Sequence, residues 1–261
     1  MIYSFLTLTD EAIFQKAADS FKEMGFIVLK DFFQKEELKI LCKSSNQLAR
    51  DALSKNLNDS TLNHSFSDVD YDVLARSNRS EVLHRGNDQS YDQGMTDIFN
   101  PSYWYQKKSP QSSELIEKLR SGLILKLINS VNSNVYPKNN NLYIHENVKN
   151  PRCAHIDSVR DYFKLFLALS DQTNVSCGPF GVIPKTHKRK IKNYLMCQVN
   201  NRLKRLKGGR VTDATFYNNQ ELSPILLELG SIAICNQSIV HGALPAANNG
   251  SRLTFVQTYD R

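Results

Sequence analysis

Apolar residues near the start of the chain recur every three or four positions. This spacing predicts one apolar face of a helix that begins after Asp10 and ends at Gly25. The residues that set the spacing are Ile13, Ala17, Phe21 and Met24. The uninterrupted apolar run Phe26–Leu29 then predicts a short strand, and a second helix is predicted from Gln34 toward Leu53.

The middle of the chain is divided between polar and helical stretches. Residues 54–100 are rich in Asn, Ser and Asp and only weakly periodic, so we expect loops there that fold over a site. Leucine and isoleucine spacing predicts another helix over Ser112–Ile128. An Asn-rich turn region, broken by Pro137, is expected over Asn129–Asn141.

From Leu142 onward the pattern changes to short apolar runs bounded by Gly, Pro, Asn or Asp. Such runs predict the strands of a sandwich or barrel, and the helices that precede them should pack on one outer face. We therefore predict one mainly β domain over residues 1–261, with a helical and loop part at about 8–141 and a β core at about 142–260. The predicted strands are Leu142–His145, Tyr162–Leu169, Phe180–Ile183, Pro224–Leu227, Ser231–Cys235 and Leu253–Tyr259.

Composition narrows the class of protein. The 261 residues are 41% hydrophobic and 23% charged, as in an ordinary globular chain, which excludes a disordered or fibrous protein. No apolar run approaches the roughly 18 residues that span a bilayer. The five cysteines form no C-x-x-C pair, so we expect free thiols. The first basic side chain, Lys16, follows acidic residues, so we expect no secretory signal and a cytoplasmic location.

The net charge of +7 is concentrated in one segment. Ten basic and no acidic residues lie between Lys185 and Arg210, which leaves the rest of the chain at −3. This distribution indicates a local basic surface rather than a basic protein.

Two short segments carry the residue types of a metal site. His155-Ile156-Asp157 places its imidazole and carboxylate on one side of an extended chain, and His241 lies 86 residues further on. Two imidazoles and one carboxylate form a facial triad that suits ferrous iron. The H-E-x-x-H spacing of zinc hydrolases is absent. A His-x-Asp pair on its own is more often an ordinary surface pair that arises by chance.

Several further motifs follow one another in a set order. After His155-Ile156-Asp157 come Leu167-Ala168-Leu169-Ser170-Asp171 and the stretch from Cys177 to Lys188, which contains Gly178-Pro179-Phe180 and Ile183-Pro184-Lys185-Thr186-His187. Leu229-Gly230-Ser231, His241-Gly242-Ala243, Asn248 and Ser251-Arg252 complete the series, and the opening stretch Phe21–Phe32 fits as well. This order resembles the phytanoyl-CoA dioxygenase family from about residue 10 to residue 259, and is vague between about 55 and 140.

The resemblance implies a double-stranded β-helix, or jelly roll, that uses Fe(II), 2-oxoglutarate and dioxygen and releases succinate and carbon dioxide. His155, Asp157 and His241 occupy the family's three iron-ligand positions, and Arg252 occupies the position that binds the distal carboxylate of 2-oxoglutarate. A guanidinium suits this task because it binds a carboxylate through two parallel hydrogen bonds. An Asp at the carboxylate position favours hydroxylation, since halogenating relatives carry a small residue there.

Supporting residues follow from the same resemblance. Tyr143 is a candidate hydrogen-bond donor to 2-oxoglutarate and Phe166 a candidate wall of its pocket, although both are also compatible with packed strand aromatics. Ala243 stands where relatives often have Ser, and Lys185-Thr186 where they usually have Gly-Ser. His187 is interpreted as a turn residue, and His145 as a hydrogen-bonded strand residue.

The substrate is the least determined part. The candidate substrate contacts are Arg85, Lys204 and Arg205. The basic segment favours an anionic or carrier-linked small molecule or another biosynthetic intermediate as substrate. A solvated basic helix explains the segment equally well. A nucleic-acid or protein demethylase or hydroxylase on the same fold is one alternative, but nucleic acid is disfavoured because Tyr194 is the segment's one aromatic residue. A binding protein without turnover is another. We expect a small-molecule partner, no membrane span, and a monomer or homodimer.

Overall fold

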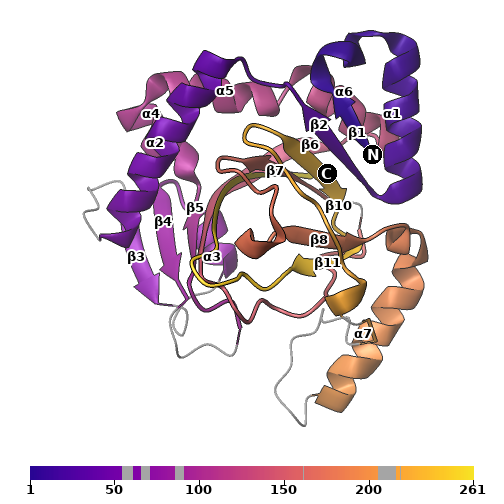
Figure 1. The fold of residues 1–261 in the computed structure, drawn as a ribbon. Helices are drawn as coiled ribbons and strands as arrows, with labels where there is room; N and C mark the ends of the chain where they lie inside the picture. Colours follow the sequence, from indigo (N-terminus) through magenta and orange to yellow (C-terminus); the bar gives the residue numbers. More distant parts are fainter. Residues whose placement is uncertain (55–60, 66–70, 86–90, 161, 205–215, 218) are drawn as a thin grey trace.

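Two β-sheets form the centre of the computed structural model, which describes residues 1–54, 61–65, 71–85, 91–160, 162–204, 216–217 and 219–261 (Figure 1). In this part of the chain the larger sheet has nine strands in the order β1-β2-β10-β7-β12-β6-β5-β4-β3, and the smaller has the order β11-β8-β9. Neighbouring strands are antiparallel, except that β1 is parallel to β2 and β3 to β4. The mixed architecture is a double-stranded β-helix, as predicted.

The strands of the larger sheet are β1 (Ile2–Ser4), β2 (Phe26–Lys30), β3 (Thr61–Ser65), β4 (Ser80–His84), β5 (Met95–Phe99), β6 (Tyr136–Glu146), β7 (Phe163–Ala168), β10 (Ile232–Asn236) and β12 (Ser251–Asp260). Those of the smaller sheet are β8 (Phe180–Ile183), β9 (Ser223–Pro224) and β11 (Val240–Ala243). The helices are α1 (Glu11–Met24), α2 (Lys35–Leu53), α3 (Tyr71–Ala75), α4 (Pro101–Lys108), α5 (Pro110–Leu119), α6 (Gly122–Val131) and α7 (Lys190–Lys204), with short 3-10 turns at Phe5–Thr9, Val175–Cys177, Thr186–Arg189 and Asn219–Glu221. None of the described helices is long and apolar enough to cross a membrane.

Helix α1 has the boundaries that its sequence predicts. The Asp10 carboxylate accepts hydrogen bonds from the backbone N–H groups of Ala12 and Ile13, at 2.9 and 3.1 Å, and so caps the helix. Gly25 ends it with a φ of 82°, where a side chain would be strained, and a Cβ atom there would lie 2.4 Å from Nδ1 of His187. Glycine is therefore required both by the turn and by the close approach of the β8–α7 connection.

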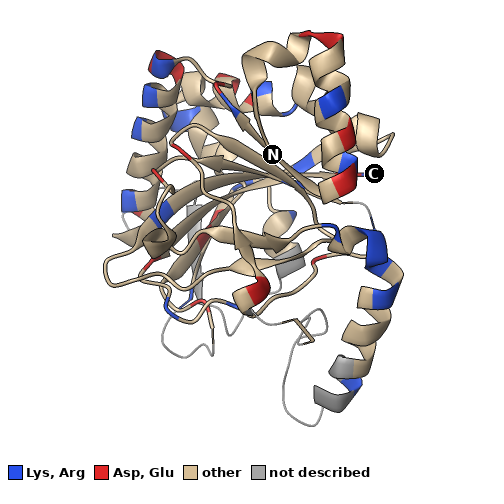
Figure 2. Ribbon diagram, turned by 45° about the vertical axis from the view of Figure 1, so that its right-hand side comes forward, with Lys and Arg blue, Asp and Glu red and all other residues tan. Residues whose placement is uncertain are grey.

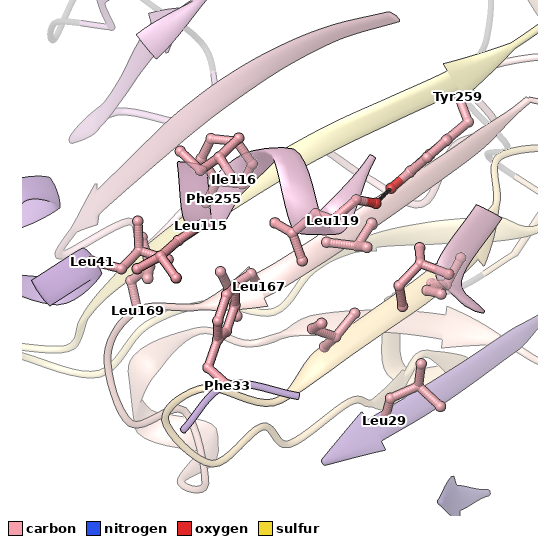
Figure 3. Packing of buried hydrophobic residues seen from close by; sticks show 14 of the residues in the cluster. Leu29, Phe33, Leu41, Leu115, Ile116, Leu119, Leu167, Leu169, Phe255 and Tyr259 are labelled. Carbon is pink, nitrogen blue, oxygen red and sulfur yellow. Dashed lines mark hydrogen bonds between the residues drawn. The ribbon is translucent and has the colours of Figure 1, made fainter. Parts of the chain in front are cut away.

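The larger sheet separates two hydrophobic layers. On β7, Phe163, Leu165 and Leu167 pack into the cluster formed with the helices, whereas Phe166 and Ala168 pack between the two sheets. Figure 3 shows the helical side of this arrangement, where Leu167 and Phe255 lie near Leu115, Ile116 and Leu119 of α5. The hydroxyl of Tyr259 donates a hydrogen bond to the carbonyl of Leu119, at 2.5 Å, and so joins the sheet to that helix.

The structure corrects three sequence-based expectations. Residues 54–100 are not loop throughout, because β3, α3, β4 and β5 fall inside this range. The predicted helix over 112–128 is divided into α5 and α6, because Gly122 adopts a φ of 59° and interrupts it. Finally, β6 begins at Tyr136, inside the expected turn region, because its polar residues Asn139–Asn141 pair with β12 or accept hydrogen bonds from it.

Replacement of a fully buried side chain at the sheet–helix contact should destabilise the fold. Leu167 has no exposed surface, so we expect Leu167→Ala to lower the free energy of unfolding by about 2–5 kcal/mol through lost burial and a residual cavity. The measurement is urea unfolding followed by circular dichroism. Leu229, which is 46% exposed, provides the control: Leu229→Ala should change the value by less than about 0.5 kcal/mol. Equal effects of the two substitutions would contradict the assigned core.

Candidate functional site

Backbone pairing brings together the two segments that carry the candidate metal ligands. His155 and His241 form an isolated antiparallel bridge in which each N–H donates to the other residue's carbonyl, at 2.8 and 2.9 Å. His241 lies on β11, while His155 and Asp157 lie in the extended segment between β6 and β7. One ligand atom from each of the three side chains falls within 4.8 Å of the others. The structure thus places residues 86 positions apart in sequence into one cluster.

Hydrogen bonds select the imidazole nitrogens that face this cluster. Nδ1 of His155 lies 2.9 Å from the carbonyl of Cys153, and Nδ1 of His241 lies 2.9 Å from the carbonyl of Ile239. A carbonyl oxygen only accepts, so each Nδ1 carries the proton and each Nε2 keeps its lone pair free. Burial, reinforced by His241, lowers the pKa of His155 to about 4, which leaves this imidazole neutral at physiological pH.

The carboxylate of Asp157 completes the donor set. Its Oδ1 lies 3.5 Å from Nε2 of His155, and its Oδ2 lies 3.7 Å from Nε2 of His241. Burial alone would raise the pKa of Asp157, but the ammonium of Lys164 and His241 outweigh burial and hold this pKa well below its usual range. Two imidazoles and one ionised carboxylate are the donors that ferrous iron prefers, so the residues present fit that ion.

Arg252 is a buried cation that lines the same cavity as the three candidate metal ligands. It lies on β12, is 7% exposed, and stands opposite His145 of β6. Among the residues that the structure describes, no carboxylate forms an ion pair with its guanidinium, and its Nε has no hydrogen-bond partner. Burial lowers the pKa of Arg252 to about 10, so the side chain still carries its charge. A buried guanidinium that lacks a protein carboxylate suits an anionic ligand, such as the distal carboxylate of 2-oxoglutarate.

His145 orients that guanidinium. Nη2 of Arg252 lies 3.1 Å from Nε2 of His145, and because arginine only donates, Nε2 of His145 must accept. Burial, with a further contribution from Arg252, holds the pKa of His145 well below its ordinary value of 6.5. The imidazole is therefore neutral, in agreement with the prediction that His145 is a hydrogen-bonded strand residue.

The candidate metal ligands and Arg252 line one cavity of about 310 Å³. Tyr143 and Phe166 line it as well. Burial raises the pKa of Tyr143 to about 12, so its hydroxyl keeps its proton. Phe166 stacks on Phe180 with 4.5 Å between ring centroids, and Phe180 lies 5.4 Å from the ring of His241, which gives the cavity an apolar wall beside the metal ligands.

Arg85 also lines the cavity, but the protein itself supplies its partners. Its two terminal nitrogens contact Asp92 and Asp97 at 2.8 and 2.6 Å, and all three side chains are buried. Burial raises the pKa of Asp97, although Arg85 opposes this effect. Because two carboxylates already hold its guanidinium, Arg85 contributes little net positive charge to the cavity, and its contact with a substrate stays a prediction.

The described part of the basic segment lies away from this cavity. Figure 2 shows Lys and Arg positions along α7, which extends from the rest of the molecule, and none of the described residues after Lys185 in this segment lines the cavity. Lys204 ends α7, but its side chain lies outside the described residues, as does the whole of Arg205. Their proposed contacts with substrate stay predictions.

Sequence reasoning missed several cavity residues, among them Lys164, Asp97 and Thr254. A charged residue in an otherwise apolar strand was the available signal for Lys164, because every other residue of β7 is apolar. Thr254 follows Arg252 by two positions and so faces the same side of β12. Asp97 lay in a stretch that was interpreted as loop, so its orientation was not considered.

Comparison with known proteins identifies relatives of the whole fold. A family profile described as phytanoyl-CoA dioxygenase (PhyH) matches residues 21–254. The solved structure of AviO1 from Streptomyces viridochromogenes Tue57 is 18% identical, with a TM-score of 0.59 over 95% of this chain and 94% of that one. None of the curated protein sequences compared with this chain matches it.

Two further solved structures contain ligands. The epimerase SnoN in complex with Fe3+, alpha ketoglutarate and nogalamycin RO is 14% identical, with a TM-score of 0.60 over 96% of this chain and 84% of that one. EctD from S. alaskensis with bound Fe is 15% identical, with a TM-score of 0.57 over 94% of this chain and 75% of that one. At these identities the likeness establishes a shared fold.

The neutral state of His145 has a consequence for stability against pH. The unfolded chain takes up a proton on His145 as the pH falls through about 6.5, whereas the folded chain does not, so acidification favours unfolding. Between about pH 6.5 and about pH 5.5 this residue should contribute a loss of about 1 kcal/mol. Urea unfolding of wild type and His145→Gln at several pH values measures the difference. Parallel pH dependences of the two proteins would contradict the lowered pKa, because they would mean that His145 takes up its proton over the same pH range in the folded and unfolded chains.

Proposed function

From the premise that this chain belongs to the phytanoyl-CoA dioxygenase family, we propose that it hydroxylates an unactivated C–H bond of a small molecule. The chain is an enzyme of the Fe(II)- and 2-oxoglutarate-dependent dioxygenases. The observation that carries the proposal is that the His155, Asp157 and His241 cluster shares one cavity with a buried guanidinium that has no carboxylate partner among the described residues.

Three side chains would hold the metal: His155 and His241 through Nε2, and Asp157 through a carboxylate oxygen. Three protein ligands leave further coordination positions for small molecules. When bound, Fe(II) supplies dioxygen activation coupled to the decarboxylation of 2-oxoglutarate, so that one oxygen atom enters the substrate and the other enters succinate. The task of the chain is to position both organic molecules and to keep water away from them.

Arg252 would bind the distal carboxylate of 2-oxoglutarate through its guanidinium. Burial strengthens this interaction because little water competes for either partner. The hydrogen bond to Nε2 of His145 limits the orientations that the guanidinium can adopt. Tyr143 keeps a protonated hydroxyl that can donate to the cosubstrate, and the stacked pair Phe166 and Phe180 excludes water from one side.

The substrate that we propose is a biosynthetic intermediate small enough to enter this cavity. Support comes from two structures of similar fold that were solved with an organic molecule bound: SnoN with nogalamycin RO, and HygX from Streptomyces hygroscopicus with hygromycin B. A cavity of about 310 Å³ falls in the range of small-molecule sites. The basic segment, which motivated an anionic substrate or nucleic acid, supplies no cavity residue among those described, so we do not extend the proposal to nucleic acid.

Anaerobic titration tests the cosubstrate site. Metal-free protein given Fe(II) and then 2-oxoglutarate should develop the visible absorption band of the metal–2-oxoglutarate chelate. Arg252→Met should raise the Kd of 2-oxoglutarate by a factor of about 10–100 and leave Fe(II) binding intact, because it removes a charge-assisted pair worth about 1.5–3 kcal/mol. Arg160→Met, at an exposed arginine, should behave as wild type. Iron binding without any band in the wild type would contradict the proposed function.

Turnover tests the reaction itself. Under air, with Fe(II) and 2-oxoglutarate, the wild type should release succinate faster when a suitable small molecule is present, and mass spectrometry should find that molecule heavier by one oxygen atom. Asp157→Ala should abolish both signals because it removes a metal ligand, while Asp171→Ala, at an exposed carboxylate, should preserve them. Succinate release that continues unchanged in Asp157→Ala would contradict the assigned metal site.

A further inference from the structure

Strand β7 carries a lysine inside the two-sheet sandwich. Lys164 shares the face of β7 that bears Phe166, so it points between the sheets rather than toward the helices. The strand lies between β10 and β12, where Lys164 is opposite Cys235 and Thr258. Its side chain is 17% exposed and lines the cavity. Lysine is rarely buried to this degree without a partner.

The partner is the candidate metal ligand Asp157. Nζ of Lys164 lies 2.5 Å from Oδ2 of Asp157, and the ammonium is also 5.9 Å from the centre of the Tyr162 ring. This short contact between an ammonium and a carboxylate is a charge-assisted hydrogen bond, the strong kind that fixes the position of both groups.

The contact distinguishes the two oxygens of the carboxylate. Oδ2 accepts from Lys164 and lies 3.7 Å from Nε2 of His241, whereas Oδ1 lies 3.5 Å from Nε2 of His155 and has no donor as close as Lys164 among the described residues. A carboxylate that binds a metal through one oxygen leaves the other for a hydrogen-bond donor, and such outer partners orient metal ligands. A carboxylate without that partner can rotate, or can bind the metal through both oxygens and occupy a further coordination position.

We propose that Lys164 is a positioning residue that holds Oδ2 of Asp157 and so leaves Oδ1 to the metal. This inference rests on the proposed function, because it takes Asp157 as a ligand of Fe(II). It also extends that function, since the facial arrangement then depends on a fourth side chain supplied by a central strand.

A lysine that only neutralised Asp157 would have the opposite effect on Fe(II) affinity from a lysine that positions it. If Lys164 served only to neutralise Asp157, its positive charge would repel a divalent cation, and removal of that charge would leave Fe(II) binding equally tight or tighter. If Lys164 positions the carboxylate, its removal weakens Fe(II) binding by about 10–100-fold. The direction of the change therefore separates the two roles.

The experiment compares Lys164→Met, Lys164→Gln and wild type in anaerobic Fe(II) titrations. We expect Lys164→Met to raise the Kd of Fe(II) at least about tenfold and to shift or weaken the visible band of the 2-oxoglutarate chelate. Lys164→Gln lacks the charge but still donates hydrogen bonds, so it should recover part of the affinity. Lys30→Met removes a lysine from another ion pair, at 2.6 Å from Glu228 on the surface, and should match wild type.

Metal-free protein gives an independent reading of the pair. Lys164→Met leaves a buried carboxylate without a cation, so its melting temperature should fall, and Asp157→Asn in the same chain should restore most of the loss. If Lys164→Met does not fold, the Fe(II) affinity of Lys164→Gln is compared with that of wild type instead. The counter-ion role predicts equal or tighter Fe(II) binding for this variant too. Such binding, with an unchanged band, would overturn the inference. Failure of the proposed function would be distinct, since the wild type itself would then give no band.

Discussion

The two backbone hydrogen bonds between His155 and His241 are the constraint on which the site depends. They join the extended segment after β6 to β11 of the smaller sheet, and so bring together residues that neither sheet alone would hold. Local hydrogen bonds then orient the rings, because each Nδ1 donates to a carbonyl two residues earlier in the chain. Ring orientation therefore follows from backbone geometry, before any metal binds.

Burial determines which charged side chains of the cavity have a partner within the protein. In a cavity with little water, each ionised group requires a partner, and the protein supplies one to Lys164 and Arg85 in the form of aspartates. Arg252 is treated differently, since a neutral imidazole contacts it where a carboxylate would otherwise stand. Arg252 thus stays available for a ligand, while aspartates neutralise Lys164 and Arg85.

Sequence patterns predicted those helices and strands whose apolar residues face the core and whose polar residues face away from it. Helix α1 and strands β7, β8, β10 and β12 were found because their apolar residues repeat at the period of the element, and the ordered motifs identified the family. Strand β5 was missed because the cavity requires a polar residue, Asp97, on its inner face. The partners of Arg85 and Lys164 come from separate strands and loops, so no spacing along the chain could have revealed them.

Strand order in the larger sheet has a consequence for how the protein folds. Strand β2 lies beside β10, with Val28 opposite Ala233. Two stretches roughly 200 residues apart must therefore meet before the backbone groups along the shared edges of these two strands find their hydrogen-bond partners. Strand β12, which carries Arg252, is inserted between β6 and β7. During synthesis the ribosome must therefore release most of the chain before the sheet can close, and until then apolar strand edges stay open to other chains. Slow folding is therefore expected for a protein whose site is assembled from such distant segments.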